Sequence, residues 1–212
     1  MGVSGKAKDP FTAALETLRR QLRFGRFVMG EPLTISDLAH ELGLSATPVR
    51  EALSRLAGEG LIEDRRGRGY FAPRLDVADA VGLYKLRRLY LVEALAGSTS
   101  HHATVSLALM RQPEGDDDAS GAIAGFFEKL VVLAENRALF DAYKQISDRL
   151  APIVRVEDRV LDLGADVVSL EQALPQDAVA LSRAITTMHK ERQDRSHDLV
   201  RTMRASTNID SL

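Results

Sequence analysis

The sequence contains no cysteine, and this absence excludes several kinds of site. Without thiols the chain cannot form disulfides, hold zinc through thiolates or use a cysteine nucleophile. Long apolar runs are missing as well, because the longest aliphatic stretch, Leu130–Ala134, is far too short to span a bilayer. No apolar segment of signal-peptide length follows the basic start, MGVSGKAKDP. We therefore expect a cytoplasmic protein that has no membrane partner.

Sequence motifs of common enzymes are also absent. The chain has no Gly-rich phosphate loop, no nucleophile elbow and no HExxH sequence. Acidic residues are plentiful, but no pattern pairs them for acid–base catalysis. We predict that the protein is not an enzyme.

The net charge is small, but the charged residues are unevenly distributed. The formal net charge of the 212-residue chain is -2. Residues 1–75 contain 12 Lys/Arg and 9 Asp/Glu, whereas residues 76–212 contain 16 Lys/Arg and 21 Asp/Glu. This asymmetry predicts a small basic domain, residues 1–75, followed by a larger acidic domain, residues 76–212.

The basic part begins with a pattern typical of two helices. Apolar residues recur at spacings of three and four over residues 11–22, which predicts a first amphipathic helix. Thr34 can cap a second, shorter helix, and Gly43 ends it.

A third helix and a hairpin follow directly. Ser45 or Thr47 can accept the free N–H groups at the start of this helix, and residues 49–57 supply its apolar stripe. The segment LIEDRRGRGYFAP then predicts two short strands, 61–64 and 70–72, joined by a Gly-rich turn. Helix, helix, turn, helix and hairpin in this order predict a winged helix-turn-helix.

The third helix carries the residue types that read DNA. Arg50 lies off the apolar stripe, and an arginine there can make two hydrogen bonds to a guanine in the major groove. Ser45 and Thr47 lie at the helix N-terminus, where phosphates are favoured. Arg55 is interpreted differently, because Glu51 lies four residues earlier and can pair with it.

The turn of the hairpin is rich in glycine and arginine. Gly67 allows the backbone to approach a neighbouring groove, and Arg66 and Arg68 can contact phosphates and release counterions. These residues, together with the third helix, predict double-stranded DNA as the partner.

The acidic part predicts helices and almost no β-structure. Helical stripes cover residues 81–95, 123–134, 139–160 and 179–203, and we expect a kink or break at Pro152. The whole chain is therefore predicted to be mainly α, with a winged helix-turn-helix, a small β-hairpin wing and a C-terminal all-α bundle.

The segment SATPVREALSRLAGEGLIEDRRGRGYF resembles the N-terminal domain of GntR-type bacterial transcription regulators. The resemblance runs from about Phe11 to Phe71, and it includes the Gly-Leu after the third helix and the Gly-Arg-Gly of the wing. Many members have arginine at the positions of Ser36 and Ala46, and these departures indicate a different or more permissive operator preference. By this resemblance the DNA contacts come from Ser36, Ser45, Thr47, Arg50, Gly67 and Arg68.

The helical part resembles the FadR/FCD branch of that family. Members of this branch often bind a divalent metal through an aspartate and three histidines, ligands that suit a borderline cation. Aligned on LAENRALF, the aspartate position falls at about Ile123, the first histidine at Phe127 and a further pair near Asp166–Val167. His189 alone lies near a ligand position. We therefore expect that the metal site is lost and that the protein has no cofactor.

The resemblance also implies a small effector, for which the sequence offers several polar residues on apolar helices. Arginine can hold a carboxylate through two hydrogen bonds. Tyr84, Arg87 and Arg155 belong to the same class of residue, and any of them can equally be an exposed or interface residue. The predicted effector-binding residues are Arg88, Tyr143, Arg149 and His189.

These observations predict a homodimeric, sequence-specific DNA-binding regulator, a repressor that binds a palindromic operator. In the mechanism that the family implies, an effector biases the spacing of two DNA-binding domains through its differential affinity for two bundle arrangements. Two alternatives stay open: a metal-responsive helical protein with secondary DNA binding, and an architectural dimer that binds no ligand.

Overall fold

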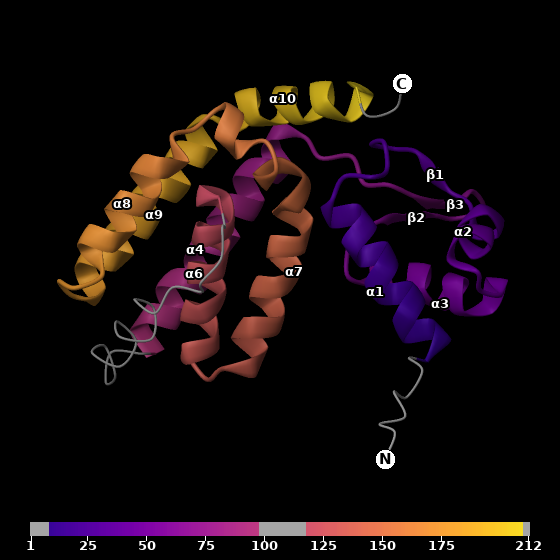
Figure 1. The fold of residues 1–212 in the computed structure, drawn as a ribbon, viewed down its shortest axis with the longest axis horizontal. Helices are drawn as coiled ribbons and strands as arrows, with labels where there is room; N and C mark the ends of the chain where they lie inside the picture. The colour runs from indigo at the N-terminus through magenta and orange to yellow at the C-terminus, as the bar shows by residue number, and fades with distance from the viewer. Residues whose placement is uncertain (1–8, 98–117, 210–212) are drawn as a thin grey trace, which may run out of the picture. The chain divides into compact units, whose positions relative to one another are not determined.

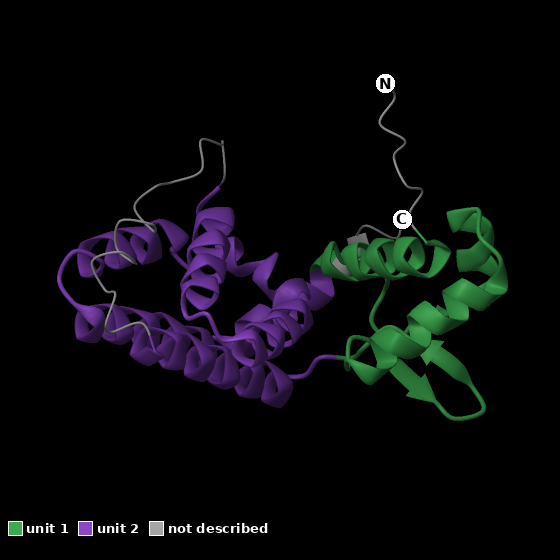
Figure 2. Ribbon diagram, turned by 90° about the horizontal axis from the view of Figure 1, so that it is seen from below, with its two compact units in different colours: residues 1–74, 206–212 green, residues 75–205 purple. Residues whose placement is uncertain are grey.

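The computed structural model describes residues 9–97 and 118–209 of the chain (Figure 1). The chain divides into two compact units, residues 1–74 with 206–212, and residues 75–205 (Figure 2). We call the first the winged unit and the second the helical unit. None of the described helices is long and apolar enough to cross a membrane.

The winged unit contains three helices and three short strands. Asp9 caps the first helix, because its carboxylate accepts a hydrogen bond from the Thr12 N–H at 3.2 Å. Gly43 ends the second helix in the left-handed region, with φ of 63°. The elements are α1 (Pro10–Arg23), β1 (Pro32–Leu33), α2 (Ile35–Leu42), α3 (Ala46–Gly58), β2 (Glu63–Arg65) and β3 (Gly69–Phe71).

The core of the winged unit forms where α1 packs against α3. The apolar stripe of α3 is fully buried, as the sequence predicts, and Ala14 and Leu18 of α1 are buried in the same cluster. The predicted winged helix-turn-helix is thereby confirmed. The buried stripe residues are Val49, Ala52, Leu53 and Leu56.

The sheet has one strand more than the sequence predicts. Its order is β1-β3-β2, and both pairings are antiparallel, with Leu33 opposite Tyr70 and Glu63 opposite Phe71. The two-residue strand β1 has no periodicity of its own and exists only through its pairing with β3. The predicted strand 61–64 begins later, at Glu63, which pairs with the last residue of β3, Phe71. Leu61 and Ile62 before it are buried in the core of the winged unit.

The helical unit is built around α4, which packs against α6, α7 and α9. Figure 1 shows α4, α6 and α7 side by side. Asp118, Asn136, Asp162 and Asp177 each cap the N-terminus of the helix that follows. The elements are α4 (Val77–Gly97), α6 (Ala119–Leu133), α7 (Arg137–Val154), the 3-10 turn η2 (Glu157–Arg159), α8 (Leu163–Ala173), α9 (Ala178–Asp194) and α10 (Ser196–Ile209), of which residues 206–209 are assigned to the winged unit.

Two of the predicted helical stretches are divided in the structure. Pro152 lies inside α7, and the helix ends two residues after it. Proline has no N–H to donate to the carbonyl of the preceding turn, so it weakens the helix at this point. The stretch 179–203 is two helices, α9 and α10, which meet at Arg195. Helix α8 is not among the predicted stripes.

Candidate nucleic-acid interface

Helix α3 presents a polar face opposite its buried stripe. Thr47, Arg50 and Ser54 are exposed on this face. Ser45 is the N-cap residue of α3, but its side chain makes no capping hydrogen bond, which corrects the expected role of Ser45 or Thr47 in satisfying the helix start. The hydroxyls of Ser45 and Thr47 are both exposed and can meet a ligand at the helix N-terminus.

The two arginines of α3 have different surroundings. Arg55 donates from Nε to Glu59 Oε1 at 2.7 Å, so its i,i+4 partner lies after it in the helix, and the expected pairing with Glu51 is wrong. Glu59 also pairs with Arg19 of α1, which ties the C-terminal end of α3 to α1. Arg50 is exposed and makes no side-chain hydrogen bond or ion pair within the described part of the chain.

The three arginines of the wing also differ in their surroundings: one is paired with a carboxylate and two are exposed without such a partner among the described residues. Arg65 donates from Nε and Nη2 to Glu63 Oε2 at 2.9 and 2.7 Å, and its guanidinium lies 4.2 Å from the centroid of the Phe71 ring. These hydrogen bonds from Arg65 hold the pKa of Glu63 below its ordinary value. Arg66 and Arg68 are exposed, and their side chains have no ion-pair partner among the residues that the structure describes.

Gly67 lies at the tip of the wing, where the backbone needs a positive φ. Its φ is 74° and that of Gly69 is 88°, a region that side chains with a Cβ rarely adopt. The N–H of Arg68 donates to the Arg65 carbonyl at 2.7 Å and closes the turn. The wing therefore carries Arg66 and Arg68 on a tight turn with open space beside Gly67.

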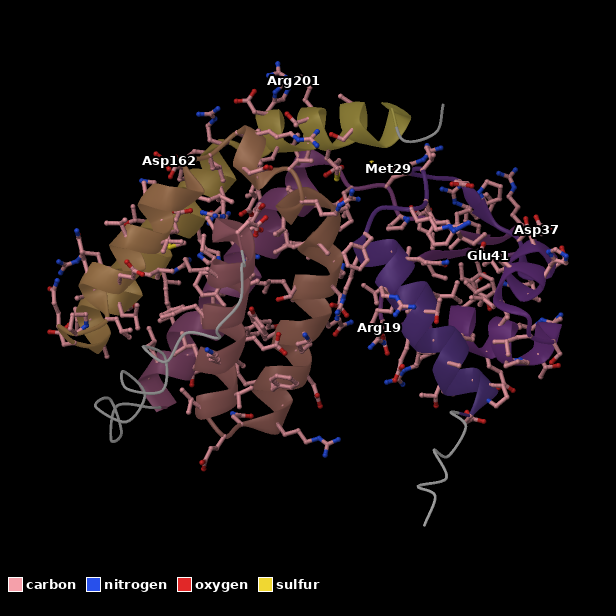
Figure 3. The ribbon with its side chains drawn as sticks, in the orientation of Figure 1. Arg19, Met29, Asp37, Glu41, Asp162 and Arg201 are labelled. Atoms are coloured by element: carbon pink, nitrogen blue, oxygen red, sulfur yellow. The ribbon has the colours of Figure 1, made fainter. Side chains whose placement is uncertain are left out.

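Ser36 is exposed in the first turn of α2, and its hydroxyl donates to Asp37 Oδ1 at 3.3 Å. Figure 3 shows Asp37 and Glu41, both on α2. Glu41 accepts hydrogen bonds from Gln21 and Arg26, so it anchors the end of α1 and the following loop to α2. All seven residues predicted to contact DNA belong to the winged unit, on α2, in the N-terminal half of α3 with its N-cap residue, or on the wing.

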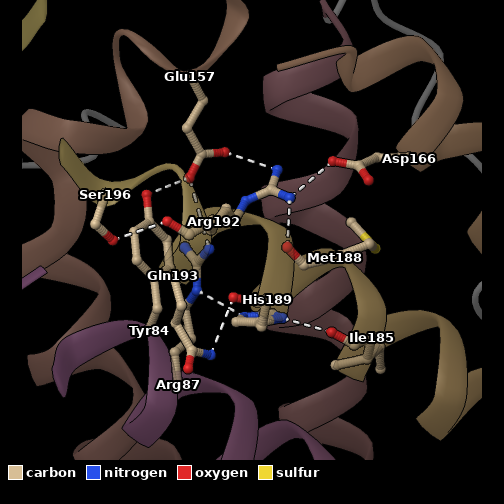
Figure 4. A network of polar contacts seen from close by, with 10 residues as sticks. All are labelled: Tyr84, Arg87, Glu157, Asp166, Ile185, Met188, His189, Arg192, Gln193 and Ser196. Carbon is tan, nitrogen blue, oxygen red and sulfur yellow. Dashed lines mark hydrogen bonds and ion pairs between the residues drawn. The ribbon is translucent and has the colours of Figure 1, made fainter. Parts of the chain in front are cut away.

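The helical unit buries a cluster of polar side chains, shown in Figure 4. Glu157 is at its centre: one carboxylate oxygen, Oε1, accepts from the Tyr84 hydroxyl at 2.7 Å, and the other, Oε2, accepts from Arg192 Nη2 at 2.8 Å. Arg192 also pairs through Nη1 with Asp166 at 2.8 Å. Burial alone would lower the pKa of Arg192, but Glu157 and Asp166 raise it above the ordinary value.

His189 and Arg87 form the second half of the cluster. The Nδ1 of His189 lies 2.8 Å from the Ile185 carbonyl, which can only accept, so Nδ1 carries the proton. Its Nε2 then accepts a hydrogen bond from Arg87 Nε at 3.1 Å. Burial, and then the neighbouring charge of Arg87, hold the pKa of His189 well below its ordinary value, so the imidazole is neutral.

The four predicted effector-binding residues differ in their relation to the cluster. His189 belongs to the cluster, and Tyr143 is buried on α7, where burial raises the pKa of its hydroxyl. Arg88 and Arg149 are half-buried and make no hydrogen bond or ion pair with the cluster among the described residues.

Sequence reasoning missed Glu157, Asp166 and Arg192 as members of the cluster. A signal was present in the spacing: His189 and Arg192 lie three residues apart on an apolar helix, as do Tyr84 and Arg87. Two polar pairs with this spacing place four polar groups toward a core, which requires partners for them.

The residues do not fit the metal site that the family resemblance implies. Ile123 and Phe127 are buried apolar side chains at two ligand positions, and Asp166 is paired with Arg192. The lone pair on Nε2 of His189, which a metal would need, accepts from Arg87. No group of three or more His, Asp or Glu side chains within the described residues could hold a metal ion.

Comparison with known proteins finds a family that the winged unit is similar to. The gntR family of bacterial regulatory proteins matches residues 12–71. The Nta operon transcriptional regulator of Aminobacter aminovorans is 31% identical over 133 residues, 58% of this chain and 63% of that protein. A probable D-xylose utilization operon transcriptional repressor of Paenarthrobacter nicotinovorans is 31% identical over 141 residues, 61% of this chain and 62% of that protein. The matched stretches thus span less than two thirds of these two relatives.

Solved structures share the fold over most of the chain. McbR/YncC of E. coli has a TM-score of 0.69 at 16% identity, covering 91% of this chain and 99% of that one. A GntR transcriptional regulator of Rhodococcus sp. RHA1 has a TM-score of 0.65 at 19% identity, covering 88% of this chain and 96% of that one. The family match and the fold coincide: residues 12–71, which match the gntR family of bacterial regulatory proteins, form the helices and the wing of a winged helix-turn-helix.

Proposed function

We propose that the protein is a sequence-specific DNA-binding transcription regulator, and that it acts as a repressor. The observation that supports this proposal is that the arginines of the winged unit fall into two groups, those paired with carboxylates and those exposed without them. Arg55 and Arg65 are held by Glu59 and Glu63, whereas Arg50, Arg66 and Arg68 are exposed. Guanidinium groups without carboxylate partners, on a helix and a wing of this fold, are available for bases and phosphates.

The division of labour follows from position. Arg50 lies beyond the first turn of α3, so it reads a guanine edge while Ser45 and Thr47 meet phosphates at the helix N-terminus. Arg66 and Arg68 contact phosphates from the wing, with Gly67 allowing a close approach. Ser36 at the start of α2 adds a hydroxyl contact to the backbone.

The experiment that tests this proposal is selection of bound fragments from a random DNA pool by the full chain. A recovered consensus with two inverted half-sites is the expected result. The same selection with Arg50→Ala identifies the base pair that Arg50 reads, because that position alone should lose its preference. Recovery of unselected sequence from the parent protein would contradict the proposal.

We infer that the regulator is a homodimer on a palindromic operator. Two-fold pairing doubles the readout of a short half-site. A surface for this pairing is available on α4, where Leu86 and Leu89 are 39% and 50% exposed and lie three residues apart. Light scattering should give twice the chain mass of 23.2 kDa. Leu86→Lys with Leu89→Lys should give the monomer, and Val168→Lys, at an exposed apolar residue on α8, should not.

We also propose that a small carboxylate effector binds the helical unit. The support is a buried donor without an acceptor: Arg192 Nε makes no hydrogen bond among the described residues. A carboxylate that reached this N–H would gain a charge-assisted hydrogen bond. Thermal unfolding against a panel of carboxylates and sugar acids tests this, with Arg88→Leu, Tyr143→Phe and Arg149→Leu to locate the site. If no compound raises the midpoint, the architectural alternative replaces this part of the proposal.

A further inference from the structure

Glu51 is an exposed carboxylate on the polar face of α3. It lies four residues after Thr47 and three before Ser54, so the three side chains share one face of the helix. The buried stripe that includes Val49 and Leu53 lies on the other face and packs into the core of the winged unit. Glu51 is therefore part of the surface that α3 presents to a ligand.

The carboxylate of Glu51 has no partner in the described part of the chain. Helix spacing would pair it with Arg55, four residues later, but Arg55 donates to Glu59 Oε1 at 2.7 Å. Glu59 also pairs with Arg19, so it holds two arginines at the C-terminal end of α3. Glu51 makes no side-chain hydrogen bond or ion pair with any residue that the structure describes. Its acceptor oxygens stay available for a ligand.

A carboxylate on a surface that meets DNA opposes binding unless it finds a specific partner. The phosphates of the duplex repel it at every sequence, against the attraction that Arg50, Arg66 and Arg68 supply. Entry into the groove also removes water from the carboxylate, and a desolvated charge requires a hydrogen-bond donor. Glu51 therefore disfavours any sequence that places no donor beside it.

Two bases present a hydrogen-bond donor in the major groove. Cytosine presents its N4 amino group, whereas adenine presents its N6 amino group next to an acceptor, N7. An ionised carboxylate can only accept hydrogen bonds, so adenine N7 repels it. The chemistry of Glu51 thus favours cytosine over the other three bases.

We propose that Glu51 is a second specificity-determining residue of α3, which accepts a hydrogen bond from the N4 amino group of one cytosine in each half-site. The inference rests on the proposed function, because it requires α3 to lie in the major groove. Arg50 and Glu51 then act in opposite senses. Arg50 adds affinity at a guanine, and Glu51 lowers affinity wherever its cytosine is replaced.

The test is selection from a random DNA pool by the full chain and by Glu51→Gln. Glutamine has nearly the same shape as glutamate, but its amide can accept from adenine N6 and donate to adenine N7. One position in each half-site should therefore change from cytosine in the parent consensus to adenine in that of Glu51→Gln. The guanine that Arg50 reads should stay. With Glu51→Ala, the preference at the cytosine position should disappear.

Titration with defined duplexes measures the size of the effect. Replacing the cytosine base pair should weaken binding of the parent by roughly tenfold and that of Glu51→Ala by much less. Glu51→Ala should also bind random duplexes more tightly than the parent, because the repulsion between its carboxylate and the phosphates is gone. Glu171→Gln, which removes one negative charge from an exposed position on α8, is the matched control and should equal the parent in both titrations.

The outcomes separate this inference from the proposed function. If the parent yields a consensus and both Glu51 variants yield the same one, α3 reads DNA without Glu51, and this inference alone is wrong. If the parent yields no consensus, sequence-specific binding itself is contradicted. Equal affinity of the parent and Glu51→Ala for random duplexes would mean that Glu51 does not face DNA. Because Glu51 is exposed and outside the buried stripe, both variants should unfold thermally at the midpoint of the parent.

Discussion

The two units use arginine in opposite ways. In the winged unit Arg50, Arg66 and Arg68 are exposed, whereas in the helical unit Arg87 and Arg192 are buried at 6% and 0% exposure. The difference lies in the partners. A buried guanidinium requires carboxylates within reach, and Glu157 and Asp166 supply them, while an exposed one is left to meet a ligand. The same residue type is therefore structural in one unit and available for binding in the other.

The largest effect is expected from removing a carboxylate that pairs with the buried arginines of the helical unit. Glu157→Gln removes the carboxylate that holds Arg192 and faces Arg87, and leaves two buried cations with one counter-charge. We expect the helical unit to lose about 3–5 kcal/mol of unfolding free energy. Urea unfolding of the full chain measures this.

Glu171→Gln, an exposed acid on α8, is the matched control and should change the unfolding free energy by less than about 0.5 kcal/mol. If the two variants unfold alike, the cluster contributes no more than a surface charge, and its assignment as a structural element is wrong.

The next largest effect is expected from replacing an exposed arginine of the winged unit, Arg50. Arg50→Ala should lose discrimination between the selected operator and random DNA, by roughly 1–3 kcal/mol per half-site. Arg55→Ala is the control on the same helix, because Arg55 is held by Glu59. Titration of both variants with operator and random duplexes should show reduced selectivity for Arg50→Ala and the selectivity of the parent for Arg55→Ala. If the selectivity of Arg50→Ala equals that of the parent, α3 is not the recognition helix.

A wing substitution should differ in kind from one in α3. Arg68→Ala should weaken binding to operator and random DNA alike, because a phosphate contact carries little sequence information. The slope of log affinity against log salt should become shallower by roughly 0.9 for each phosphate that the arginine no longer neutralises. Arg65→Lys keeps the charge at a residue that contacts Glu63 and Phe71, so its slope should equal that of the parent. A slope unchanged in Arg68→Ala would exclude the phosphate contact.

Sequence patterns predicted the position of the exposed arginines of the winged unit better than they predicted the buried cluster of the helical unit. The phase of Arg50 against the stripe of α3 follows from helical periodicity over a few residues, and Val49 and Leu53 are buried as that periodicity requires. The seven predicted DNA contacts stay predictions, although the fold that carries them is confirmed.

The buried cluster depends on packing that no local pattern contains. Glu157 and Arg192 are 35 residues apart, and Arg87 and His189 are 102 apart. Their contact follows only when α4, η2 and α9 are placed together. Strand β1 was missed for the same reason, because its two residues are extended only by pairing with Tyr70 and Phe71.

The smallest expected effect concerns Arg65 at the base of the wing, which is half-buried and paired with Glu63. Hydrogen bonds from Arg65 hold the pKa of Glu63 below its ordinary value of 4.5 in the folded chain. As the pH falls through 4.5, the unfolded chain takes up the proton first. The stabilisation by Glu63 is therefore fully present at neutral pH and is lost as the pH falls from about 5 toward the lower folded value. Because both side chains are partly exposed, the effect is small.

Thermal unfolding of the winged unit at a series of pH values measures this contribution of Glu63. Parent and Glu63→Gln should differ in the unfolding midpoint at pH 7, and the difference should shrink in acid because the parent then takes up the proton as well. Asp64→Asn, at the next and exposed residue, should show no such convergence. A difference between parent and Glu63→Gln that stays constant down to the pH of acid unfolding would mean that the ion pair with Arg65 does not stabilise the wing.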